Sequence, residues 1–206
     1  MEPNFLITFF MWFINISYLG ALLPQLFLNY KMKTTSGLSD LYILGYFSGY
    51  AAHIFYVYGL NFPVVYRIMG PFALLAVALI VFQRFFYRDI QICFGSLKLY
   101  FIGLLIIITA IFIFLNSPKI VGMCAGWVAM VIWSVYQLPQ VFKIYQTKSV
   151  KGFSFLLVSM IAVGNLIEFI IAFVLNWPIQ SLLIALRGLI IYSIFCVQFW
   201  KYSEYK

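Results

Sequence analysis

The segment Leu23-Pro24-Gln25-Leu26-Phe27 recurs 115 residues later as Leu138-Pro139-Gln140-Val141-Phe142. The same offset holds without a gap as far as Asn61-Phe62-Pro63 in the first copy and Asn176-Trp177-Pro178 in the second. Between positions 23 and 63, 13 of 41 positions are identical, which is too many for two unrelated apolar segments. The pattern predicts a tandem duplication in which both copies run in the same order.

The amino-acid composition excludes a soluble globular protein. Of the 206 residues, 65% are hydrophobic and 9% are charged, whereas soluble domains carry about 25% charged residues. We therefore expect an integral, multi-pass membrane protein whose partner is the lipid bilayer. The net charge of +8 does not indicate binding to nucleic acid, because the basic residues lie at the ends of apolar segments.

Seven apolar segments are long enough to cross a bilayer, which takes about 20 helical residues. They cover 6–30, 40–60, 63–84, 98–116, 119–143, 154–175 and 178–200. The repeat includes the first three and the last three, and 98–116 has no counterpart. We expect an all-α membrane protein with seven transmembrane helices as 3+1+3, two parallel triple-helix bundles joined by an inversion linker helix. The expected domain limits are 1–90, 91–117 and 118–206.

Basic residues gather on one side of these segments. Arg67 and Lys119 lie on the other side, and the first side holds ten: Lys31, Lys33, Arg84, Arg88, Lys98, Lys143, Lys148, Lys151, Lys201 and Lys206. Because cytoplasmic loops carry an excess of Lys and Arg, we expect the N-terminus outside and the C-terminus in the cytoplasm. The short loops favour a bacterial inner membrane.

Side chains in the loops indicate how the helices begin. Ser39 and Ser154 are expected to cap the helices that follow them. Asn61 and Asn176 are expected to cap the next helix in each copy. These roles are structural and carry no chemistry.

Two ionisable groups lie at equivalent positions inside the apolar segments, His53 in the first copy and Glu168 in the second. Each lies about nine residues before its Asn-aromatic-Pro turn, which at about 1.5 Å per residue is near the middle of the bilayer. A carboxylate there costs about 2.5–3.5 kcal/mol, so it faces the interior or water. Arg187 lies at the same height as Glu168, so a buried ion pair between them is geometrically possible.

Asn165 lies one helical turn from Glu168, and Tyr50 takes its place in the first copy. Two interpretations are open. In the first, Glu168 and Arg187 form a structural ion pair and His53 is a core histidine. In the second, these five residues line a central cavity and bind a charged or zwitterionic solute, with Glu168 or His53 available to carry a proton. The equivalent positions at an interface between two bundles favour the second.

Pro24 and Pro139 each remove a backbone donor inside an apolar helix, so both helices are expected to bend. The first interpretation is a static kink, and the second is a pair of hinges. In the second, Gln25 and Gln140 bind the backbone groups that the prolines leave free. Because both copies keep the dipeptide, we favour the hinges.

No motif for metal or catalytic chemistry is present. Cys93, Cys124 and Cys196 are scattered without metal-ligand spacing. No Ser-His-Asp, paired-Asp or metal-binding cluster appears in the sequence. We therefore expect neither an enzyme nor a bound metal or cofactor.

The Pro-Gln dipeptide, with Lys nine, Gly thirteen and Ser fifteen residues after the proline, resembles the PQ-loop repeat family of cystinosin-like and SWEET-like transporters. The resemblance implies a transporter of small solutes that works by alternating access. It also implies hinges at Pro24 and Pro139 and a site at mid-depth, which by position would include His53, Asn165, Glu168 and Arg187. Unlike the sugar carriers, the chain has no proline in 40–60 or 154–175.

We therefore expect a transporter of a small polar solute, with amino acids ahead of sugars because the site carries charge. Coupling to protons and the oligomeric state stay open. The alternatives are a sugar facilitator of the SWEET type, or a non-transporting membrane receptor or accessory protein on the same fold.

Overall fold

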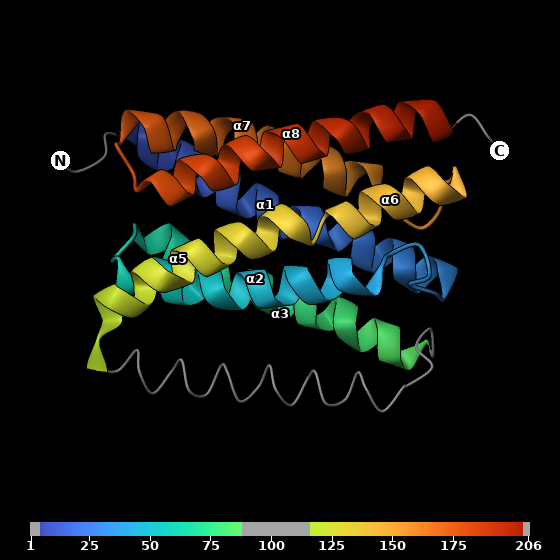
Figure 1. Cartoon of the computed structure of the whole chain (residues 1–206), viewed down its shortest axis with the longest axis horizontal. Helices are drawn as coiled ribbons and strands as arrows, with labels where there is room; N and C mark the ends of the chain where they lie inside the picture. Colours follow the sequence, from blue (N-terminus) through green and yellow to red (C-terminus); the bar gives the residue numbers. More distant parts are fainter. Residues whose placement is uncertain (1–4, 88–115, 204–206) are drawn as a thin grey trace.

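The computed structural model describes residues 5–87 and 116–203, and helices make up this part of the chain (Figure 1). Their bounds are α1 Phe5–Met32, α2 Asp40–Gly59, α3 Val64–Phe86, α5 Pro118–Val135, α6 Leu138–Thr147, α7 Phe155–Val174 and α8 Ile179–Tyr202. Six of the seven expected segments coincide with these helices to within a few residues, although 119–143 is divided. The expected linker helix at 98–116 lies outside the described residues, apart from its last position.

Both halves of the chain pack in the same way. α3 packs against α1 and α2, and α8 packs against α5, α6 and α7. Between the halves, α2 packs against α5 and α1 packs against α7. The first helix of each half therefore lies against the second helix of the other, as a parallel repeat related by a pseudo-twofold axis requires.

Five helical stretches in the described part are long and apolar enough to cross a membrane: α1, α3, α5 with α6, α7 and α8. The protein is therefore an integral, multi-pass membrane protein, as the composition predicts. α2 has 20 residues but is not among the five. It carries five tyrosines, and its buried side chains include Tyr42, Tyr46 and Tyr50. These polar side chains of α2 therefore face the interior of the bundle.

The predicted serine caps are confirmed, and the predicted asparagine caps are wrong. The hydroxyls of Ser39 and Ser154 accept from the third backbone amide that follows each. Asn61 and Asn176 instead adopt left-handed φ angles of 53° and 50° directly after α2 and α7. Asparagine tolerates that conformation at the end of a helix. These residues therefore end the preceding helix and do not begin the next.

The two proline-containing helices differ. α1 continues through Pro24 without a break. In the second copy, α5 ends at Val135 and α6 begins at Leu138, so the helix is interrupted at Tyr136 and Gln137, just before Pro139. A proline in a helix removes one hydrogen bond and clashes with the preceding turn. The first copy tolerates this change, whereas the second copy divides at the same place.

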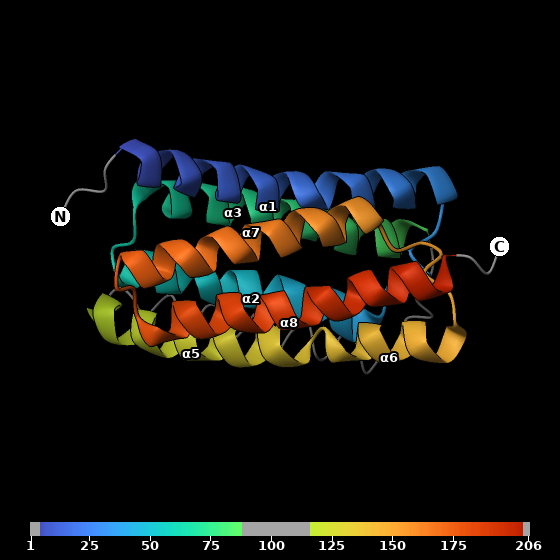
Figure 2. The ribbon, with the colours of Figure 1, turned by 90° about the horizontal axis from the view of Figure 1, so that it is seen from above.

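The connections between the helices lie at the two ends of the bundle (Figure 2). We call the end with loops 33–39 and 148–154 the Pro-Gln end, and the end with loops 60–63 and 175–178 the Asn-Pro end. At the Asn-Pro end, the rings of Phe62 and Trp177 lie 5.1 Å apart. At the Pro-Gln end, the two loops meet at Gly37 and Gly152, where a Cβ on Gly37 would lie 2.6 Å from backbone atoms of Gly152.

This backbone contact predicts a steric effect. Gly37→Ala should destabilise the protein by about 1–3 kcal/mol, because the backbone of Gly152 has to move. The control is Gly20→Ala, whose new methyl would meet the flexible end of Met160 at 3.3 Å. Thermal unfolding in detergent should show a lower Tm for Gly37→Ala alone. A Gly37→Ala protein with the Tm of the unchanged chain would contradict the contact.

Candidate functional site

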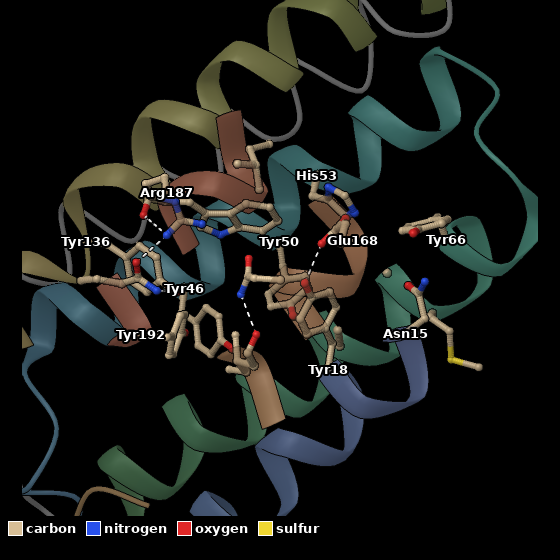
Figure 3. A pocket seen from close by; sticks show the side chains of 18 residues that line it. Asn15, Tyr18, Tyr46, Tyr50, His53, Tyr66, Tyr136, Glu168, Arg187 and Tyr192 are labelled. Carbon is tan, nitrogen blue, oxygen red and sulfur yellow. Dashed lines mark hydrogen bonds between the residues drawn. The ribbon is translucent and has the colours of Figure 1, made fainter. Parts of the chain in front are cut away.

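A cavity lies between the two halves, with about 650 Å³ of space that includes its opening. Tyrosines contribute much of its lining (Figure 3). The structure brings the five predicted site residues together in its wall: Tyr50, His53, Asn165, Glu168 and Arg187. They come from α2, α7 and α8, so both halves of the chain build the cavity.

Glu168 binds a tyrosine of the other half. Its Oε2 accepts the hydroxyl of Tyr18 in α1 at 2.6 Å. The ring of Tyr18 packs over Gly164, where a Cβ would lie 2.5 Å from the ring. α1 can therefore approach α7 closely enough for this charge-assisted hydrogen bond to form.

Arg187 also has partners other than Glu168. Its Nη1 donates to the backbone carbonyl of Trp133 and to Oε1 of Gln137. In a continuous helix, the amide of Gln137 would bond to that carbonyl, but the interruption before Pro139 frees it. A cation is also favourable at the C-terminus of α5. The direct ion pair that the sequence allowed between Glu168 and Arg187 is therefore not formed, although both side chains reach the same cavity.

Two asparagines lie in the cavity wall. Nδ2 of Asn165 donates to the carbonyl of Ile161 at 2.7 Å, and Nδ2 of Asn15 donates to that of Met11 at 2.9 Å. Gly188 makes room for Asn165, because a Cβ there would lie 2.0 Å from its Oδ1. Each amide is held by its own helix, and the side chain borders the cavity.

The repeat also relates two aromatic residues that are not among the predicted site residues. Tyr18 and Trp133 are 115 residues apart. Trp133 packs over Gly49 as Tyr18 packs over Gly164. Its ring centroid lies 5.2 Å from that of His53. Gly49 and Gly164 are an identical pair in the repeat, so extending the alignment toward the N-terminus would have found these two rings.

Aromatic side chains narrow the cavity toward the Pro-Gln end. Tyr136 stacks on Tyr46 with ring centroids 5.4 Å apart, and it lies 5.2 Å from Tyr42. Tyr192 lines the same region. These tyrosines lie between the predicted site residues and the two loops. We call these rings the tyrosine layer. The repeat does not indicate it, because contacts between the halves bring the rings together.

The glutamines of the two Pro-Gln motifs cross between the halves. Gln25 in α1 accepts the amide of Ser154 through Oε1 at 2.9 Å and donates through Nε2 to the carbonyl of Gly152 at 3.0 Å. Gln140 in α6 accepts the amide of Ser39 at 2.8 Å and donates to the carbonyl of Gly37 at 3.0 Å. Each amide thus binds the loop of the opposite half. We call these four hydrogen bonds the glutamine latch.

The glutamine latch corrects the expected role of Gln25 and Gln140. They do not bind the carbonyls that the prolines leave free in their own helices. Both side chains are almost fully buried, so an unpaired amide there would be costly. Lys143 makes two further hydrogen bonds between the halves at this end, because its Nζ donates to the carbonyls of Ser36 and Leu38. The latch holds the two loops together at the Pro-Gln end.

Comparisons with known proteins identify the family and the fold of the chain. The family described as PQ loop repeat matches twice, at residues 6–66 and 121–181. Among solved structures, the chain is similar to a eukaryotic SWEET transporter, with a TM-score of 0.61 and 14% sequence identity. That likeness covers 93% of this chain and 99% of the other, and it shows a shared fold. No curated protein sequence matches the chain.

The glutamine latch predicts a change in access at the Pro-Gln end. Gln140→Leu removes two hydrogen bonds, each contributing about 0.5–1.5 kcal/mol, so the loops should separate at least about fivefold more often. The reporter is Leu38→Cys, a position that is 1% exposed. Its labelling by a membrane-impermeant maleimide, in a background without other cysteines, should become faster.

The matched control is Gln146→Leu, which makes the same change at an exposed position in α6. The control should leave the labelling rate unchanged. Equal labelling rates for Gln140→Leu and the unchanged chain would show that the latch does not limit access.

Proposed function

The chain belongs to the PQ-loop repeat family, and from this premise we propose that it is a membrane transporter that moves a small polar solute between two compartments. The observation that supports this most strongly is the central cavity. Both halves of the chain line it, and it contains a carboxylate, a guanidinium and an imidazole. Burying such groups at membrane depth costs free energy, and in membrane proteins they mark pathways for polar solutes.

An amino acid is the favoured solute. Glu168 is an anion that suits an ammonium group, and Arg187 is a cation that suits a carboxylate. Asn165, Tyr50 and His53 supply hydrogen-bonding groups between these charges. The second candidate is a sugar, which the tyrosine and tryptophan faces of the cavity also suit, and the solved relative is a SWEET transporter.

Alternating access would use the two ends of the bundle in turn. At the Pro-Gln end, the glutamine latch and the tyrosine layer close the path. At the Asn-Pro end, Phe62 and Trp177 meet across the axis. Opening one end requires one set of contacts to break, and Pro24 and Pro139 lie beside the latch as hinges. The interruption before Pro139 supports a larger movement in the second half.

The finer architecture is also part of the proposal. We assign the chain to seven transmembrane helices as 3+1+3, with domains at 1–90, 91–117 and 118–206. We place the N-terminus outside and the Pro-Gln end and the C-terminus in the cytoplasm, because the sequence puts ten basic residues in the segments expected on that side. The short loops favour a bacterial cell.

The site assignment predicts loss of transport in Glu168→Gln. The neutral amide loses the charge-assisted bond to an ammonium group, which is a loss of about 1.5–3 kcal/mol or at least about tenfold in uptake. Uptake is measured in proteoliposomes with radiolabelled amino acids and sugars, with and without an imposed pH gradient. The gradient distinguishes proton-coupled transport from facilitated diffusion.

The matched control is Glu204→Gln, the same change beyond the end of α8. It should keep the uptake of the unchanged chain. Normal uptake by Glu168→Gln would remove Glu168 from the site, and sugar uptake without amino-acid uptake would favour the second candidate. Binding without any counterflow would instead indicate a receptor.

The orientation predicts which exposed positions a reagent reaches from outside the cell. Val64→Cys at the Asn-Pro end is 54% exposed, and Ser36→Cys at the Pro-Gln end is exposed as well. In intact bacteria, an impermeant maleimide that reaches the periplasm should label Val64→Cys. Ser36→Cys should react only after the inner membrane is permeabilised. The reverse pattern would invert the proposed topology.

A further inference from the structure

One wall of the central cavity carries polar atoms without partners. Nε1 of Trp133, Nε of Arg187 and Nδ1 of His53 are buried and have no hydrogen-bond partner among the described residues. All three side chains line the cavity. Buried polar groups in proteins are almost always paired, so this wall is prepared for a partner that the protein itself does not supply.

The chemistry of that partner follows from the atoms. The indole N–H of Trp133 and the N–H groups of Arg187 can only donate hydrogen bonds. The Nη1 of Arg187 already binds the carbonyl of Trp133 and Oε1 of Gln137. These two acceptors fix the guanidinium plane and leave its Nε edge for a further acceptor. A planar anion with two oxygens, such as a carboxylate, fits an edge of this kind.

The cavity also contains a group that accepts hydrogen bonds, Glu168. Glu168 can only accept hydrogen bonds while it is charged. Its Oε2 accepts a hydrogen bond from the hydroxyl of Tyr18. Tyr18 and Tyr50 place aromatic rings in the same cavity, and aromatic faces favour cations.

We propose that the solute is a zwitterion bound in one orientation, with its carboxylate on the donor wall of Arg187 and Trp133 and its ammonium group at Glu168. Gln137 is a positioning residue, because it holds the guanidinium with its Nε edge free. This inference rests on the proposed function and deepens it, since it states which chemical group each wall selects. It assigns roles to Trp133 and Gln137, which come from the second half alone.

The two copies of the repeat differ at the positions of the donor wall. The positions equivalent to Trp133, Gln137 and Arg187 are Tyr18, Leu22 and Phe72. The first copy therefore cannot build a second donor wall of this kind. One orientation of the zwitterion is favoured because, among the described residues that line the cavity, the guanidinium comes from Arg187 in the second half.

The test compares matched ligands that differ only at the carboxylate. The probes are the standard L-amino acids and their α-carboxamides, which keep the ammonium group and the side chain. Binding to the purified protein in lipid nanodiscs is measured by calorimetry. The unchanged chain should prefer the acid to its amide by about tenfold or more, the value of one charge-assisted hydrogen bond.

Trp133→Phe removes the indole N–H and keeps an aromatic ring over Gly49. It should reduce the preference for the acid several-fold, and Gln137→Leu should do the same by releasing the guanidinium. A purely structural role for these residues would lower Tm and leave the acid-to-amide ratio unchanged. Such an unchanged ratio in Trp133→Phe would overturn the proposal, even if Gln137→Leu failed to fold.

The experiments distinguish a failure of the donor wall from a failure of the proposed transport function. Binding and uptake of sugars without binding of amino acids would overturn the donor wall and leave transport intact. Amino-acid binding with the expected ratio shifts, but without uptake into proteoliposomes, would support the donor wall and remove the transport function.

Discussion

The glutamine latch is the constraint on which the arrangement of the two halves depends. A buried amide must satisfy both its donor and its acceptor. Gln25 and Gln140 do so by reaching into the opposite loop, where a carbonyl and an amide two residues apart match the amide group. The loops can approach this closely because Gly37 and Gly152 carry no side chain. Each half is therefore incomplete without the other.

The polar interior follows from the same pairing. Because α1 lies against α7 and α2 lies against α5, Tyr18 and Trp133 reach across the interface to equivalent places. What they meet there differs, since Glu168 lies beside Tyr18 and His53 beside Trp133. The backbone is nearly symmetric, whereas the chemistry of the cavity is not. A chamber of this kind can hold a solute with two different ends in one orientation.

Much of the fold could be predicted from the sequence, because membrane helices follow length, hydropathy and the repeat offset. The positions of His53 and Glu168 in one cavity also followed from the offset. The partners of Arg187 did not. They depend on the interruption before Pro139, which frees the carbonyl of Trp133, and a sequence does not show which of two equivalent prolines will divide its helix. The crossing of Gln25 and Gln140 likewise depends on contacts between residues more than one hundred positions apart.

The most direct test of the account is a pair of distances across the axis, measured by pulsed electron paramagnetic resonance in lipid nanodiscs. Spin labels at Ser36 and Lys151 report the Pro-Gln end, and labels at Val64 and Ile179 report the Asn-Pro end. On addition of the solute that uptake identifies, the account predicts that one distance grows while the other shrinks. Two narrow distributions that do not move under any condition would contradict alternating access and leave a rigid binding protein.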